Sequence, residues 1–190
     1  MIYDYENKKV LDELFLPENE YYIAKKVLDM GLNVGVEAHS GENILTIHET
    51  QETRDHQEYE WISGESVGFN EAAKYRWNKV VYLFDNEKDL ASVKEMIAAE
   101  NAVSAFSDTS AVIAGRKRKY YEQFPTGVSK ASELDKLKKI LKIEKGCYFA
   151  MGDYYNDLEM IKKADISAVP ADTPEDIKAY ADFIAGRCED

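Results

Sequence analysis

Hydrophobic and polar positions follow two different rhythms along the chain, and the change between them falls near Pro125. In the first part, short apolar runs suited to strands are separated by stretches with a helical apolar stripe. Helices mixed with strand pairs are typical of an α+β domain. The expected helices are 17–32 and 87–100, and the expected strands are 1–6, 10–16, 33–40, 43–50, 79–85, 102–108 and 111–124.

Residues 51–78 carry no clear period. They are polar at first and then contain several aromatic residues, so we expect irregular structure and a short helix there. A set of aromatic side chains in the first part is expected to pack mainly in the core of that domain, with a ligand cage formed by a few of them as the alternative: Tyr21, Tyr22, Tyr59, Trp61, Phe69, Tyr75 and Trp77.

After Pro125 single strands alternate with single helices. The expected order is helix 130–143, strand 146–153, helix 156–164, strand 165–171, helix 173–182 and strand 183–186. The strands are nearly continuous apolar runs, which predicts a parallel sheet covered by helices. We therefore predict two domains, 1–125 and 126–190.

Composition and charge exclude several classes of protein. No apolar run approaches the roughly 20 residues that span a bilayer, and the N-terminus has no signal-peptide pattern, so no membrane contact is expected. Cys147 and Cys188 are the two cysteines. They form no disulfide framework, which favours the cytoplasm, and Cys147 is expected to be a buried, inert thiol. The net charge is −12 with one short basic run at 116–119, which argues against nucleic-acid binding.

The stretch "GDYYND" at 152–157 is the main candidate for chemistry. Asp153 stands at the end of an expected parallel strand, where ligands of α/β sheets bind. Mg²⁺ takes oxygen ligands, often one or two carboxylates with substrate phosphate, and Asn156 with the following helix N-terminus suits a phosphate oxygen. The same residues also suit a polar turn with Asp and Asn as helix caps. Taken alone, these six residues leave both interpretations open.

A second motif, "GVSK" at 127–130, and the run "NDLEMIKKA" after the first favour the metal-and-phosphate interpretation. Together they resemble the haloacid-dehalogenase-like hydrolase superfamily, specifically its Cof-type sugar-phosphate phosphatases. The resemblance implies that Lys130 neutralises nucleophile and phosphate, Asp153 binds Mg²⁺, Asn156 hydrogen-bonds the phosphate and Asp157 orients the lysine. Lys130 and Asp157 would be the catalytic residues, and Lys130 and Asn156 the phosphate ligands.

The resemblance also implies a fold. It is an α/β fold in which a Rossmann-like core segment with a parallel sheet, residues 126–190, carries an α+β cap of the C2 type. Residues 1–125 would be the cap with its leading hairpin. The family's activity is Mg²⁺-dependent hydrolysis of phosphomonoesters, here of a sugar phosphate or similar small metabolite.

Two elements of the family pattern do not occur in the 190 residues: the segment with the nucleophile, and a second motif that supplies a Ser or Thr to the phosphate. The family attacks phosphate with an aspartate in "DxDGT" after an apolar strand. Asp4 and Glu6 have the right spacing, but no apolar strand precedes them and no Gly-Thr follows. We therefore expect the chain to be inactive by itself. The alternatives are a non-catalytic phosphate-binding module and a truncated gene product without a function of its own.

The same pattern leads to a prediction about assembly. The strand at 147–152 would have one unpaired edge, and an exposed apolar edge is a template for pairing with another chain. We expect a homodimer through this edge, a rearranged sheet, or poor solubility. The other expected partner is a small phosphorylated metabolite.

Overall fold

The computed structural model describes residues 1–113, 116–144 and 146–187. It divides into two compact units: Met1–Asp12 together with Gly127–Asp190, and Glu13–Thr126. The boundary expected near Pro125 lies close to the observed one. The leading hairpin differs from the prediction because it belongs to the same unit as the C-terminal residues. In that unit the Lys136 ammonium donates to the Asp12 carboxylate at 3.0 Å.

The unit 13–126 is built on a six-stranded sheet with the order β5-β4-β3-β6-β8-β7. All neighbouring strands run antiparallel except β4 and β5, which are parallel. Its elements are η1 (Glu18–Glu20), α1 (Tyr22–Asp29), β3 (Val34–Ser40), β4 (Asn43–His48), α2 (Gln51–Glu60), β5 (Gly64–Ser66), α3 (Phe69–Ala72), β6 (Lys79–Phe84), α4 (Glu87–Ala98), β7 (Ala105–Ile113) and β8 (Arg116–Phe124).

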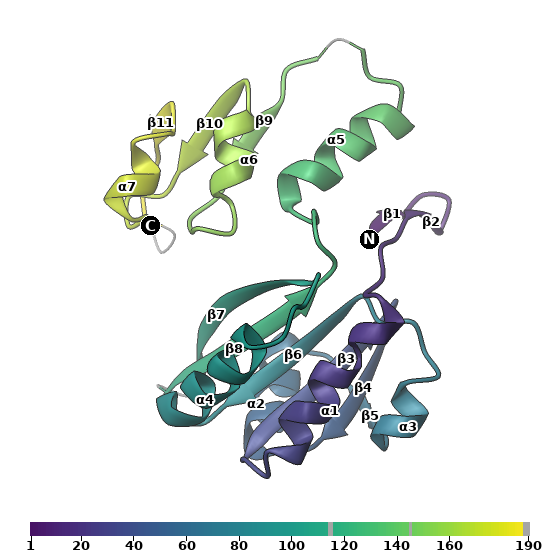
Figure 1. Ribbon diagram of the computed structural model, residues 1–190. Coiled ribbons are helices and arrows are strands. Elements are labelled where there is room, and N and C mark those ends of the chain that lie inside the picture. The colour runs from purple at the N-terminus through teal and green to yellow at the C-terminus, as the bar shows by residue number, and fades with distance from the viewer. Residues whose placement is uncertain (114–115, 145, 188–190) are drawn as a thin grey trace. The chain divides into compact units, whose positions relative to one another are not determined.

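One face of this sheet holds the main hydrophobic core. The helices α1 and α4 lie on this face, whereas α2 lies behind the sheet (Figure 1). Tyr21 and Trp77 are buried in the core and stack with ring centroids 3.8 Å apart. Apolar residues at alternate strand positions meet the apolar stripes of the helices, as the periodicity predicted. They include Val34, Val36, Ala38, Val80, Tyr82 and Phe84 from the strands, and Ile23, Val27, Leu90, Val93 and Ile97 from the helices.

The stretch 51–78 is more regular than predicted. It contains the ten-residue helix α2, the short strand β5 and the single turn α3. The periodicity missed α2 because its buried residues are Glu52, Thr53 and His56, none of them apolar. Among the aromatics expected to lie mainly in the core, Tyr21 and Trp77 are buried, whereas Trp61 is 95% exposed.

The last two strands of this sheet form one long hairpin. Strands were predicted at 102–108 and 111–124, with a break between them. In the structure β7 continues through this break, and Asp108 pairs with Tyr121 and Thr109 with Tyr120. The polar residue is tolerated in the ladder because Lys94 of α4 donates to the Asp108 carboxylate at 2.6 Å. Residues 114–115 lie outside the described residues.

The other unit contains a parallel three-stranded sheet, as predicted, with the order β11-β10-β9. Isoleucines of α6 and α7, Ile161 and Ile177, pack with Val169 on one face of it. A separate antiparallel hairpin comes from the N-terminal residues. The elements are β1 (Ile2–Asp4), β2 (Lys9–Asp12), α5 (Lys130–Ile140), β9 (Phe149–Met151), α6 (Leu158–Lys163), β10 (Ile166–Val169), α7 (Glu175–Lys178) and β11 (Phe183–Ile184).

The strand expected at 146–153 is shorter and more exposed than predicted. The strand β9 has three residues and lies at the end of the sheet order, and Phe149 and Met151 are 57% and 55% exposed. They alternate with the buried Ala150, so their side chains lie on the other face of the sheet. Cys147 precedes the strand and is exposed, so the prediction of a buried thiol is wrong. Cys188 lies outside the described residues.

Within the described ranges, no helix is both long and apolar enough to span a bilayer.

Candidate functional site

The motif 152–157 connects the end of β9 to the start of α6. Asp157 is the N-cap residue of α6 and is almost completely buried. A Cβ added at Gly152 would lie 2.4 Å from the Asp157 Cβ, far inside van der Waals contact. The glycine of the motif is therefore needed for the turn to bring Asp157 against the strand end.

The Asp157 carboxylate joins the two sequence motifs. Its Oδ1 accepts from the Lys130 ammonium at 2.5 Å, and its Oδ2 accepts from the Asp153 backbone N–H at 3.2 Å. The Asp157 side chain is 5% exposed, whereas that of Lys130 is 56% exposed. One buried carboxylate thus holds the turn of its own motif and fixes the ammonium group of a side chain that is itself more than half exposed.

The start of α5 positions the lysine. Ser129 is the N-cap residue, and it forms a reciprocal capping box with Ser132 at 2.9 and 3.1 Å. Lys130 is the first residue of the helix. A cation is unfavourable at a helix N-terminus because the helix dipole is positive there. The contact with Asp157 offsets this repulsion.

Glu159 is a further member of this region that the sequence reasoning missed. Hydrogen bonds from Ser129 and then from Lys163 lower the pKa of the Glu159 carboxyl. The Lys163 ammonium lies 3.1 Å from Glu159 and 3.5 Å from Asp135 of α5. These links join the start of α6 to α5 beside Lys130. The sequence feature that could have pointed to Glu159 is its position in the first turn of α6. By itself, an acidic residue there indicates only a favourable interaction with the helix dipole.

The two remaining motif residues, Asp153 and Asn156, are both exposed. No hydrogen bond or ion pair engages the Asp153 carboxylate among the described residues. There, too, no three side chains of His, Cys, Asp or Glu form a group that could hold a metal ion. The residues still suit Mg²⁺, because this ion commonly takes one or two carboxylates and completes its octahedron with water and phosphate. Asp153 would hold it, and the ion would supply positive charge to a phosphate group.

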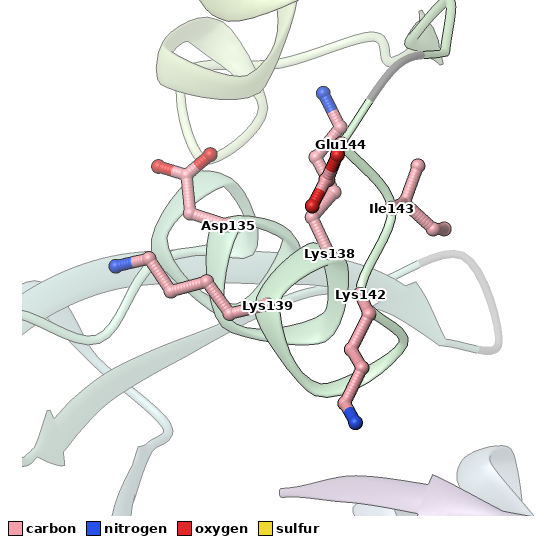
Figure 2. A pocket seen from close by; sticks show the side chains of 6 residues that line it. All are labelled: Asp135, Lys138, Lys139, Lys142, Ile143 and Glu144. Atoms are coloured by element: carbon pink, nitrogen blue, oxygen red, sulfur yellow. The ribbon is translucent and has the colours of Figure 1, made fainter.

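A surface hollow elsewhere in the same unit does not compete with this site. It lies at the C-terminal end of α5 and is lined by Asp135, Lys138, Lys139, Lys142, Ile143 and Glu144. Figure 2 shows that its three lysine side chains point in different directions. An anion would not meet converging charges there, and such lysines are common where the helix dipole is negative.

Comparisons with known proteins concern the family and the fold of the chain. A family model described as haloacid dehalogenase-like hydrolase matches residues 1–190. No curated protein matches the chain.

Solved structures match at low sequence identity. A haloacid dehalogenase-like hydrolase from Bacteroides thetaiotaomicron has a TM-score of 0.78 at 19% identity, covering 97% of this chain and 67% of that chain. A structure from Thermotoga maritima gives 0.73 at 17% identity, covering 94% and 65%. A structure described as a subclass IIB sugar phosphatase gives 0.71 at 18% identity, covering 96% and 66%.

These likenesses establish the fold. The chain spans about two thirds of the length of the solved structures it matches. With the family model matching its whole length, the chain belongs to the haloacid dehalogenase-like hydrolases.

Proposed function

We propose that the unit containing residues 127–190 carries the Mg²⁺- and phosphate-binding part of a phosphomonoester hydrolase site. The observation that carries the proposal is the convergence of Lys130, Asp157 and the Asp153 backbone at the carboxyl end of β9. The substrate class is a sugar phosphate or a similar small phosphorylated metabolite. The description of one structural neighbour as a sugar phosphatase supports this choice.

Each residue has a distinct proposed role. The Asp153 carboxylate binds Mg²⁺, and the Lys130 ammonium and the Asn156 side chain bind phosphate oxygens. Asp157 orients Lys130 and does not itself contact substrate, since its side chain is only 5% exposed and its oxygen atoms face Lys130 and the Asp153 N–H. The residues 13–126 are the proposed cap.

We further propose that these 190 residues alone do not turn over phosphate esters. They contain no aspartate in a "DxDGT" context, and the loss of a nucleophile typically costs several powers of ten in rate. Hydrolysis by the purified chain that disappeared in Asp153→Ala would contradict this. The alternatives are a phosphate-binding module without catalysis and a truncated product without a function of its own.

The open edge of β9 supports a proposal about assembly. Tyr148 and Gly152 bond to residues of the β10 side of the sheet. Along a strand, the backbone N–H and C=O groups of alternate residues point to opposite edges. Those of Phe149 and Met151 therefore point to the open edge of β9, away from β10. A second copy of the chain pairing there would satisfy these groups and cover two exposed apolar side chains.

A binding experiment tests the proposed site without requiring turnover. Inorganic phosphate is titrated into the chain by calorimetry, with and without Mg²⁺. We expect Mg²⁺ to strengthen phosphate binding in the wild type, Asp153→Asn to abolish this Mg²⁺ effect, and Lys130→Gln to weaken phosphate binding at either Mg²⁺ level. Lys142→Gln, at the far end of α5, is the matched control and should bind like the wild type.

Two results would overturn the proposal. One is an unchanged Mg²⁺ effect in Asp153→Asn. The other is an equal loss of binding in Lys142→Gln and Lys130→Gln, which would indicate only a general effect of charge.

A further inference from the structure

The helix α2 contacts the sheet of the unit 13–126 in a different way from its neighbours. The helices α1 and α4 bury aliphatic side chains such as Val27 and Val93. The buried residues of α2 are instead Glu52, Thr53 and His56. The helix therefore contributes few apolar side chains of its own to this face, and the apolar area that it covers belongs to side chains of the sheet.

The first attachment of α2 is to the carboxylate of Glu37, which is fully buried in the middle of β3. His56 Nδ1 lies 2.8 Å from Glu37 Oε2, and Gln57 Nε2 donates to Glu37 Oε1 at 2.6 Å. The same Gln57 amide group donates to Thr46 Oγ1 at 2.9 Å and accepts from the Gly64 N–H at 3.1 Å. This attachment consists entirely of hydrogen bonds.

The second attachment is to Arg118 of β8, whose side chain is 6% exposed. Its guanidinium lies 3.3 Å from the Glu52 carboxylate, forms an ion pair with Asp55, and lies 3.5 Å from Asp85 at the end of β6. Three carboxylates thus share one cation.

Two glycines allow α2 to pack closely against the sheet. A Cβ added at Gly35 would lie 2.5 Å from Thr53 Cγ2 and 2.9 Å from Thr50 Oγ1. A Cβ added at Gly64 would lie 2.4 Å from Thr46 Oγ1 and 2.7 Å from Gln57 Nε2. The start of α2 and the side chain of Gln57 therefore approach the sheet closely only because Gly35 and Gly64 have no Cβ.

With α2 in the position seen in the structure, some buried polar atoms make no hydrogen bond. Among the described residues, Glu52 Oε2, Arg118 Nε and Tyr120 OH are buried without a hydrogen-bond partner. Each such atom costs free energy that contact with water would return. Beneath α2, Val81, Leu83 and Tyr120 form a small cluster separate from the main core, and the Tyr120 ring meets His56 edge-on at 5.1 Å. Opening would expose this cluster but would leave the core with α1 and α4 intact.

From these contacts we propose that α2 is a lid that opens separately from the rest of the unit. It is seated on Gly35 and Gly64 and is attached through Glu37 and Arg118. In the open state the second face of the sheet presents a carboxylate, a guanidinium and an apolar strip. The conformational change is local, since the backbone ladder of β3, β6 and β8 contains no residue of α2.

Native-state hydrogen exchange tests the lid, because local openings are distinguished from global unfolding by smaller protection and weaker dependence on denaturant. In the wild-type chain at low urea, we expect α2 amides to exchange at least tenfold faster than amides of β3 and β6, with little urea dependence. Gly35→Ala should accelerate the exchange of α2 amides at least tenfold relative to the wild type. It should leave the ratio of the β6 exchange rate to the α4 exchange rate unchanged. Arg118→Met provides a second variant with the same expectation if Gly35→Ala does not fold.

Val93→Ala is the matched control, because it removes core volume on the opposite face. It should accelerate exchange of β3, β6 and α4 together while the local opening of α2 keeps its wild-type rate. The proposal is overturned if wild-type α2 amides exchange only with the protection and urea dependence of β6. It is also overturned if Gly35→Ala and Arg118→Met accelerate all elements equally.

Discussion

Acidification should destabilise the unit 13–126 through His39. This residue lies on β3 directly opposite Lys79 of β6, and its Nε2 is buried without a hydrogen-bond partner among the described residues. Burial, and then electrostatic interactions with Lys79 and His56, lower the pKa of His39 from 6.5 to about 3. The imidazole is therefore neutral in the folded chain far below the pH at which it takes up a proton in the unfolded chain.

The magnitude follows from the linkage between protonation and folding. Between pH 6.5 and about 3, the unfolded state binds a proton at His39 and the folded state does not. The free energy of unfolding therefore falls as the pH falls through this window. At pH 4.5 the loss is about 3 kcal/mol, from two pH units at roughly 1.4 kcal/mol each. Across the full window it reaches about 5 kcal/mol.

Urea unfolding followed by tryptophan fluorescence measures this loss, because Trp77 is fully buried in the core of the same unit. The comparison is between pH 7 and pH 4.5 for the wild type, for His39→Gln and for His48→Gln. Carboxylates contribute to all three chains alike, so their effect cancels in the difference. His39→Gln should lose about 3 kcal/mol less than the wild type between the two pH values.

His48→Gln is the control, because this histidine is exposed on β4. It should keep the pH dependence of the wild type. The reasoning is refuted if His39→Gln loses as much stability on acidification as the wild type, or if His48→Gln removes the dependence instead.

Three further predictions concern other parts of the chain. Gly152→Ala should push the Asp157 side chain away and cost about 1–3 kcal/mol of stability, with weaker phosphate binding by calorimetry; an unchanged unfolding midpoint would contradict the close approach seen here. Glu20→Gln should lower the free energy of unfolding by about 1–3 kcal/mol, because the buried carboxylate accepts from the backbone N–H groups of 103–104; urea unfolding at pH 7 that matches the wild type would count against it. Phe149→Lys should convert the proposed dimer to a monomer in light scattering, and a dimer that persists would exclude β9 as the interface.

The sequence by itself determined the local and motif-level features of this protein. Apolar residues at alternate positions or at helical spacing predicted the strands and helices of the main core. The change to single strands and helices predicted the parallel sheet. Both patterns are local, because burial of one face imposes its period on the residues that form it. The resemblance carried by "GVSK" and "GDYYND" implied that Asp157 orients Lys130, and the two side chains lie 2.5 Å apart in the structure.

Only the tertiary structure decided which surfaces are covered. Phe149 and Cys147 lie in an apolar run, yet both are exposed, because Phe149 lies on the face of the sheet opposite the buried Ala150 and Cys147 precedes β9. The helix α2 escaped the periodicity because it is attached to residues far away in the chain. Glu37 and Arg118 hold it through contacts that span 19 to 66 residues. Such contacts leave no period in the sequence, since the hydrogen-bond partners come from separate strands that only folding brings together.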